Sequence, residues 1–139
     1  MDATKADVRT QVTPGEAHEH AFSFDAEGKA VEGRDFVVRR PTRGMKREIM
    51  RRLARSLTVL GVDADVLNTV DGRFLEAEAY LGVMLATAPE HWHAPNGDLP
   101  EPALRINFDA LHEDELGRVW AEARRYLARF DEFRLQFGE

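Results

Sequence analysis

The C-terminal part of the chain carries a long stripe of apolar residues at helical spacing. The stripe consists of Leu116, Val119, Trp120, Ala123, Leu127, Phe130 and Phe137. Charged residues occupy the opposite side of the same helix, at Arg118, Glu122, Arg125 and Arg129. Because burial of each large apolar side chain stabilises a fold by about 1.5–3 kcal/mol, the stripe is expected to contribute most to the core. We therefore predict a helix near 113–136.

Two further segments are predicted to be helices. One spans 43–60, with Thr42 suited to the N-cap and Gly61 at the position of a left-handed C-cap residue. The other spans 73–88, after a turn expected at Asp71-Gly72, and Pro89 ends it. Its apolar residues spread widely around the helix, so we expect this helix to be the most buried.

A small β-hairpin is predicted to precede the helices, over 21–40. The runs AFSFD and DFVVRR are rich in aromatic and β-branched residues, and sequence with glycines separates them. Residues 1–20 hold few large apolar side chains, which favours a flexible tail followed by a single domain over 21–139. The predicted fold class is mainly α with a small N-terminal β-hairpin (α+β), a compact helical domain of three main helices.

Composition and motifs argue against several classes of function. The chain of 139 residues has no cysteine, which excludes disulfides, Cys-ligated metals and a thiol nucleophile. It also lacks a nucleophile elbow, a Walker loop and a dinucleotide fingerprint, so we predict no catalytic residue, no cofactor and no enzyme. The longest apolar run, 79–88, has about half of the roughly 20 residues of a membrane span. The N-terminus lacks a signal-peptide pattern, so we expect a cytoplasmic protein.

Histidines occur in two pairs, His18 with His20 and His91 with His93. Two imidazoles at i and i+2 can project to one side of an extended chain, and imidazole is a good ligand for zinc, nickel or copper. The spacing matches no defined zinc motif, however, and we predict no metal site. The sequence assigns no other role to these four residues.

Charge is distributed unevenly along the chain, whose formal net charge is −6. Segment 39–55 has eight basic residues and one acidic residue, Glu48, whereas the remainder has 11 basic and 24 acidic residues. On the predicted helix, a row of arginines lies away from the apolar arc, at Arg43, Arg47, Arg51 and Arg55. Three interpretations are open: a solvated face, a surface for an acidic protein, and a nucleic-acid surface. The acidic remainder and the lack of aromatic residues in the segment weigh against nucleic acid.

The order of segments resembles a known family. A hairpin leads into DFVVRRPT and a basic helix; an alanine- and leucine-rich helix closes in LATAPEHW, and the last helix contains VWAEARRYLARF. The most specific parts are the strand ending in Arg40-Pro41-Thr42 and the helix end with Pro89, Glu90 and Trp92. Over 22–133 this pattern resembles the tail assembly chaperones of long-tailed phages and prophages.

The resemblance implies a non-catalytic protein of the host cytoplasm that binds the tape measure protein and helps recruit tail tube subunits. Its partner-binding surfaces are expected at Arg39, Arg40, Arg43, Arg47, Arg51, Arg55, Phe133 and Phe137. Two alternatives stay open: a nucleic-acid-binding or regulatory helical domain that uses the arginine-rich helix, and a structural head-tail or tail completion protein. Neither the oligomeric state nor a longer frameshifted form follows from the sequence.

Overall fold

The computed structural model describes residues 17–94 and 105–138, with side chains of the last helix as far as Phe130. Within these ranges a three-stranded sheet is combined with three helices, so the predicted α+β fold with three main helices is confirmed. The strands are β1 (Glu19–Phe24), β2 (Ala30–Arg39) and β3 (Leu85–Thr87). The helices are α2 (Arg43–Leu60), α3 (Val70–Met84) and α4 (Glu113–Gly138). Short 3₁₀ turns are η1 (Ala64–Asn68), η2 (Glu90–Trp92) and η3 (Phe108–Ala110).

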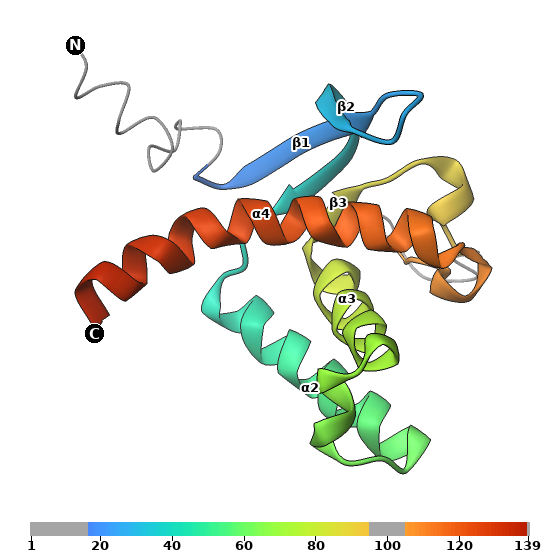
Figure 1. Ribbon diagram of the computed structural model, residues 1–139, viewed down its shortest axis with the longest axis vertical. Helices are drawn as coiled ribbons and strands as arrows, with labels where there is room; N and C mark the ends of the chain where they lie inside the picture. The colour runs from blue at the N-terminus through green and yellow to red at the C-terminus, as the bar shows by residue number, and fades with distance from the viewer. Residues whose placement is uncertain (1–16, 95–104, 139) are drawn as a thin grey trace.

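Helix α4 crosses in front of the sheet, and α2 and α3 form a hairpin that extends away from it (Figure 1). Helix α3 packs on both α2 and α4 and also contacts β2. The α2–α3 hairpin therefore has a near end beside the sheet and a far end formed by the last turn of α2, η1 and the start of α3 (Figure 1). In the described ranges, no helix is both long and apolar enough to cross a lipid bilayer.

The sheet is antiparallel, with the strand order β1-β2-β3. Its register shifts between Phe22 and Ser23 of β1, where β2 bulges, since residues 32–35 lie between the partners of these two residues, Phe36 and Val31. A Cβ atom on Gly33 would lie only 2.0 Å from Ser23 Oγ, so glycine leaves the space that the serine side chain fills. Ser23 Oγ then accepts a hydrogen bond from the backbone N–H of Asp35 at 3.2 Å, which replaces part of the interrupted ladder.

The N-terminal boundary predicted for the hairpin is wrong by two residues. Glu19 and His20 belong to β1, whereas the sequence placed them in a flexible tail over 1–20. The strand extends because His20 pairs with Val38 and its ring stacks on Tyr126 of α4, at 5.1 Å between ring centroids. Residues 1–16 lie outside the described part of the chain, so a tail there stays a prediction.

Helix α3 differs from the predicted helix over 73–88 at both ends. It begins at Val70, because the Thr69 hydroxyl accepts the backbone N–H of Gly72 at 3.1 Å and caps the helix before the expected turn. It ends at Met84, because Leu85–Thr87 forms β3 and pairs with β2. By contrast, α2 has the predicted bounds and the predicted caps, with Gly61 at φ +67°.

The core lies between the sheet, α3 and α4. Its largest fully buried side chains include Phe22 of β1, Leu81 of α3 and Val119 of α4, together with Trp92 of η2. Helix α3 buries five of its 15 residues and α2 buries two of 18, in line with the expectation for α3. The predicted stripe on α4 is buried at Leu116, Val119, Trp120 and Ala123, and partly buried at Leu127 and Phe130. Sequence periodicity missed Tyr126, which is also buried.

Candidate interaction surface

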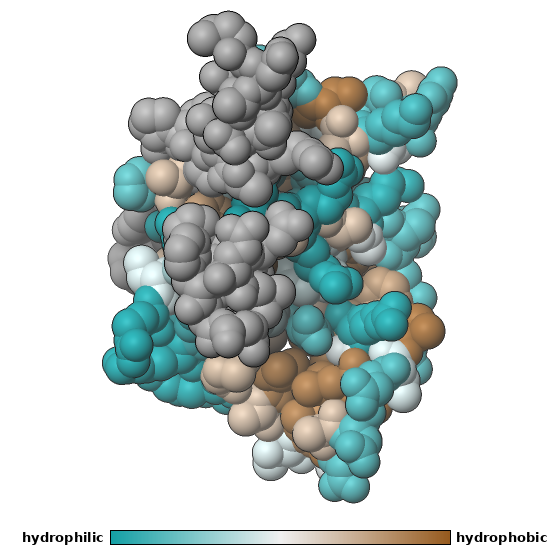
Figure 2. Space-filling view, turned by 60° about the vertical axis from the view of Figure 1, so that its left-hand side comes forward, coloured by the Kyte–Doolittle hydropathy of each residue, from teal (hydrophilic) through white to brown (hydrophobic). Residues whose placement is uncertain are grey.

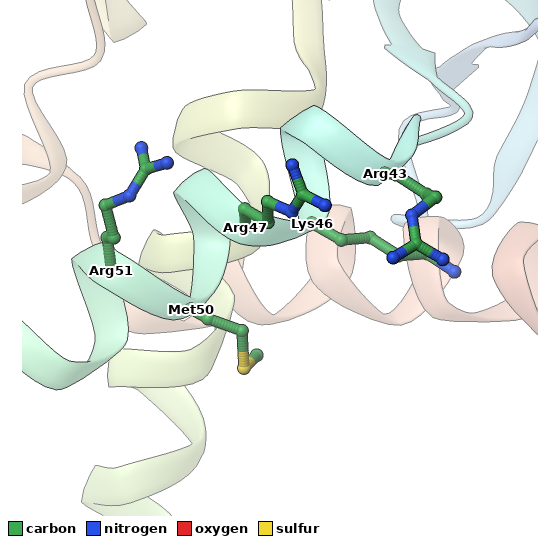
Figure 3. A pocket seen from close by; sticks show the side chains of 5 residues that line it. All are labelled: Arg43, Lys46, Arg47, Met50 and Arg51. Carbon is green, nitrogen blue, oxygen red and sulfur yellow. The ribbon is translucent and has the colours of Figure 1, made fainter.

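The outward side of α2 carries a concentration of positive charge. We call the residues that line it the basic face: Arg43, Lys46, Arg47, Met50 and Arg51. They surround an open hollow of about 540 Å³, and their side chains spread outward from the helix (Figure 3). Arg43, Arg47 and Arg51 are three of the four arginines predicted to form a row. Lys46 and Met50 belong to the same surface but were not predicted to line it.

Local sequence determines which way the basic face points. Thr42 Oγ1 accepts the backbone N–H of Met45 at 3.2 Å and fixes the start of α2. One and two turns further on, Ile49 and Leu53 are buried. Since residues about 180° away on a helix point in the opposite direction, burial of these two side chains turns Arg47 and its neighbours toward solvent.

Charge on α2 is neutralised at one position only among the described residues. Glu48 accepts hydrogen bonds from Arg51 at 2.7 Å and from Arg52 at 3.2 Å. The Arg52 hydrogen bond is the main cause that lowers the pKa of the Glu48 carboxyl, and Arg51 lowers it further. Within the described ranges, no carboxylate lies at ion-pair distance from Arg43, Lys46 or Arg47, so their charge faces solvent unpaired.

The structure separates the other predicted basic residues from this face. The Arg40 guanidinium lies over the Phe130 ring, 3.9 Å from its centroid, and so links the end of β2 to α4. Arg39 is exposed at the end of β2, and Arg55 is exposed on α2 beyond the hollow. Helix α4 continues through positions 133 and 137, but the Phe133 and Phe137 side chains lie outside the described residues, so their partner role stays a prediction.

The residues that carried the family resemblance lie between β2 and α2 and at η2. Pro41 and Thr42 connect β2 to α2, Pro89 precedes η2, and Glu90 is the first residue of η2. Trp92 has no exposed surface, packs edge-on against Phe36 and donates its indole N–H to Glu115 Oε1 at the start of α4. This motif therefore attaches the segment after β3 to the body of the fold.

The side chains of three of the four paired histidines, His20, His91 and His93, contact polar groups of the described residues, and the backbone carbonyl of His18 accepts the N–H of Arg40. His20 Nε2 lies 2.8 Å from Glu122 Oε2, and both side chains are mostly buried. Glu122 had been expected on the solvent side of α4, so that placement is wrong. His91 Nε2 lies 2.6 Å from Glu115 Oε1, and His93 Nε2 lies 2.8 Å from the carbonyl oxygen of Ala88. Across the described part of the chain, no three His, Asp or Glu side chains gather as metal ligands would.

The far end of the α2–α3 hairpin exposes apolar side chains. We call this group the apolar tip: Val59, Leu60, Val62 and Val70, with exposed fractions of 78%, 57%, 39% and 69%. Helical spacing places Leu60 on the same side of α2 as the buried Ile49 and Leu53, but Leu60 lies in the last turn of the helix and is exposed. Hydrophobic residues gather at the lower end of the molecule in Figure 2, which is the far end of the hairpin in Figure 1.

Comparison of the chain with family models, with curated proteins and with solved structures finds no match. The α2–α3 hairpin carries two exposed features, the basic face on its flank and the apolar tip at its far end. Both features are suited to contact with another macromolecule.

Proposed function

We propose that this protein is a non-catalytic assembly chaperone of the phage tail type. In this proposal it acts in the host cytoplasm, binds the tape measure protein and helps recruit tail tube subunits to it. The single observation that supports a binding role is the α2–α3 hairpin, on which three cations without an ion pair among the described residues and the apolar tip lie together. The order of segments in the sequence supports the particular family.

The physical demand on such a chaperone matches these two surfaces. In the family that the sequence resembles, the tape measure protein is a long helix whose apolar stripes make it prone to aggregation. A chaperone has to cover apolar surface and still release its client, which favours a modest contact area with a hydrophobic centre and a charged border. The apolar tip supplies the first component and the basic face supplies the second.

Co-expression tests the proposal. The tape measure protein from the same genome is produced alone and together with the wild-type chain, and its soluble fraction and co-purification are measured. We expect the wild-type chain to increase the soluble fraction, and a Val59→Asp, Leu60→Asp double variant to lose most of this effect. Val31→Asp is the control, because Val31 is an apolar residue on β2 that is 40% exposed and lies outside the α2–α3 hairpin.

Failure of the wild-type chain to raise the solubility of the tape measure protein or to co-purify with it would refute the proposal. A structural head-tail or tail completion protein is the alternative within the same setting. Peptide mass mapping of purified virions distinguishes the two, since a chaperone is absent from the finished particle and a structural protein is retained in it.

Nucleic acid is the second candidate partner, and the unpaired cations of the basic face are the observation in its favour. A protein that neutralises phosphates binds with an affinity whose logarithm falls linearly with the logarithm of salt concentration, by about 0.9 per phosphate on duplex DNA. Retention of labelled duplex DNA with that dependence would favour this function over the chaperone.

A further inference from the structure

We infer that the outward side of α2 is a docking strip for an acidic amphipathic helix of the client. The inference rests on the proposed function and specifies which part of the client is bound. It assigns Arg43, Lys46 and Arg47 of the basic face to carboxylates on that helix. Met50, Ala54 and Thr58 are assigned to an apolar side chain of the same helix.

The strip runs the length of the helix. Its members are spaced so that they share one side of α2: Arg43, Arg47, Met50, Ala54 and Thr58. All five are exposed, and the buried residues of α2 lie on the opposite side. An α-helix of four turns is long enough to pair with a client helix of similar length.

The N-terminal half of the strip selects acidic partners. Arg43 and Arg47 of the strip, and Lys46 beside it, have no carboxylate at ion-pair distance within the described ranges, and Glu48 is engaged by Arg51 and Arg52. A bound carboxylate would thus meet cations without displacing an existing partner. Arginine also presents a planar fork of donors that matches the two oxygens of a carboxylate.

The C-terminal half of the strip permits close approach of apolar surface. Met50 is 51% exposed, and its unbranched thioether side chain adapts to the shape of a partner. Ala54 is small, and the Thr58 hydroxyl already donates to the carbonyl oxygen of Ala54 at 3.0 Å. Because the Thr58 hydroxyl already has a hydrogen-bond acceptor within the helix, an apolar side chain of the client can cover this part of the strip without leaving the hydroxyl unpaired.

These two halves together favour a protein helix over nucleic acid. A phosphate backbone would use the cations but gains nothing from Met50 and Ala54, and the strip has no aromatic side chain on which a base can stack. A helix with glutamates at i and i+4 and a leucine on the adjoining side uses both halves. The client segment is therefore expected to be acidic on one side and apolar beside it.

Binding of a designed peptide to the full-length protein tests the strip. The probe is a fluorescein-labelled helical peptide of about 20 residues with glutamates at i, i+4 spacing and leucines on the adjoining side, long enough to form a helix. The control peptide has glutamine in place of every glutamate. Fluorescence anisotropy measures the affinity of each peptide at low salt and at about 0.15 M salt, where exposed charges more than about 8 Å apart are largely screened.

We expect the wild-type protein to bind the glutamate peptide at least about tenfold more tightly than the glutamine peptide at low salt. Arg43→Glu with Arg47→Glu should weaken binding by at least the same factor, and Met50→Ala by a few fold. Arg105→Glu with Arg124→Glu makes the same change of charge at exposed positions outside α2 and should leave the affinity within about twofold of wild type. All substituted side chains are exposed, and circular dichroism checks that each variant folds.

Equal affinity for the two peptides, or equal losses in the two double variants, would overturn the inference. So would duplex DNA that displaces the peptide and binds in its place with steep salt dependence. The co-expression experiment keeps this result separate from the proposed function. If the Arg43→Glu, Arg47→Glu variant still solubilises the tape measure protein, the inference about the docking strip is refuted and the chaperone proposal is retained. If the wild-type protein binds the peptide but has no effect on the tape measure protein, the docking strip is retained and the chaperone proposal is refuted.

Discussion

Replacement of Trp92 tests how the segment after β3 is attached to the fold. The indole has no exposed surface, its ring meets Phe36 edge-on at 5.2 Å between centroids, and its N–H donates to Glu115. Trp92→Ala removes the ring and the hydrogen bond together, which should lower the free energy of unfolding by about 3–5 kcal/mol. For a domain of this size the expected decrease in melting temperature is about 10–20 °C.

Two milder substitutions divide this effect into its parts. Trp92→Phe keeps a smaller aromatic ring, so it loses the N–H and also leaves a small cavity, and the Glu115 carboxylate is 31% exposed and so can regain water. The lost hydrogen bond is expected to cost about 1–2 kcal/mol, to which the cavity adds, and the total should stay below the loss for Trp92→Ala. Glu115→Gln retains an acceptor oxygen and should cost less than about 1 kcal/mol.

Urea denaturation followed by circular dichroism gives the free energies. Trp120 fluorescence supplies a second probe, since Trp120 is then the one tryptophan left of the two in the Trp92 variants. A loss below about 1 kcal/mol for Trp92→Ala would refute the assignment of Trp92 to the core. Equal losses for Trp92→Phe and Trp92→Ala would show that the six-membered ring retained in phenylalanine contributes little to stability.

Two further predictions concern close packing and a half-buried carboxyl group. Gly72→Ala should destabilise the protein by more than about 2 kcal/mol, because the new Cβ would lie 1.8 Å from the carbonyl oxygen of Val66. The matched change Gly44→Ala, in an exposed helical turn with no contact closer than 3.8 Å, should stabilise it by about 0.5–1 kcal/mol, and thermal melts compare the two. Burial, and then the charge of Asp109, raises the pKa of Glu78 above its ordinary 4.5, so the folded state holds that proton more tightly than the unfolded state. The stability that this proton contributes is complete below pH 4.5 and is lost as pH rises through the higher pKa of Glu78 in the folded state. The urea midpoint of Glu78→Gln should therefore rise relative to that of the wild type between pH 4 and pH 7. A difference between the two midpoints that does not change with pH would contradict the raised pKa.

Sequence determined the parts of the fold that depend on neighbouring residues. Helix α2 has its predicted bounds because Thr42 and Gly61 cap it through contacts within a few residues. The end of α3 was missed because Leu85–Thr87 is a strand only by pairing with β2, almost 50 residues earlier in the chain. Its start was missed because Asp-Gly is a common turn signal, and the Thr69 cap overrides it.

The candidate surface was likewise predicted where it depends on spacing within one helix and missed where it depends on contacts between distant elements. Helical spacing placed Arg43, Arg47 and Arg51 on one side of α2, which the structure confirms. Spacing alone did not indicate that Arg40 lies over Phe130, because that contact joins two elements far apart in the chain. For the same reason it placed Glu122 in solvent, although His20 of β1 is its partner. The tail chaperone family, its client and its cellular location stay predictions of the sequence.

Helix α3 continues into β3 without an intervening residue, from Met84 to Leu85. At its other root the hairpin is joined to β2 by only three residues, 40–42. Both ends of the α2–α3 hairpin are therefore joined to paired strands, β2 and β3, by three residues or fewer. Such short connections leave little chain that could act as a hinge, so a change in the orientation of the hairpin would have to alter the backbone beside the β2–β3 pair.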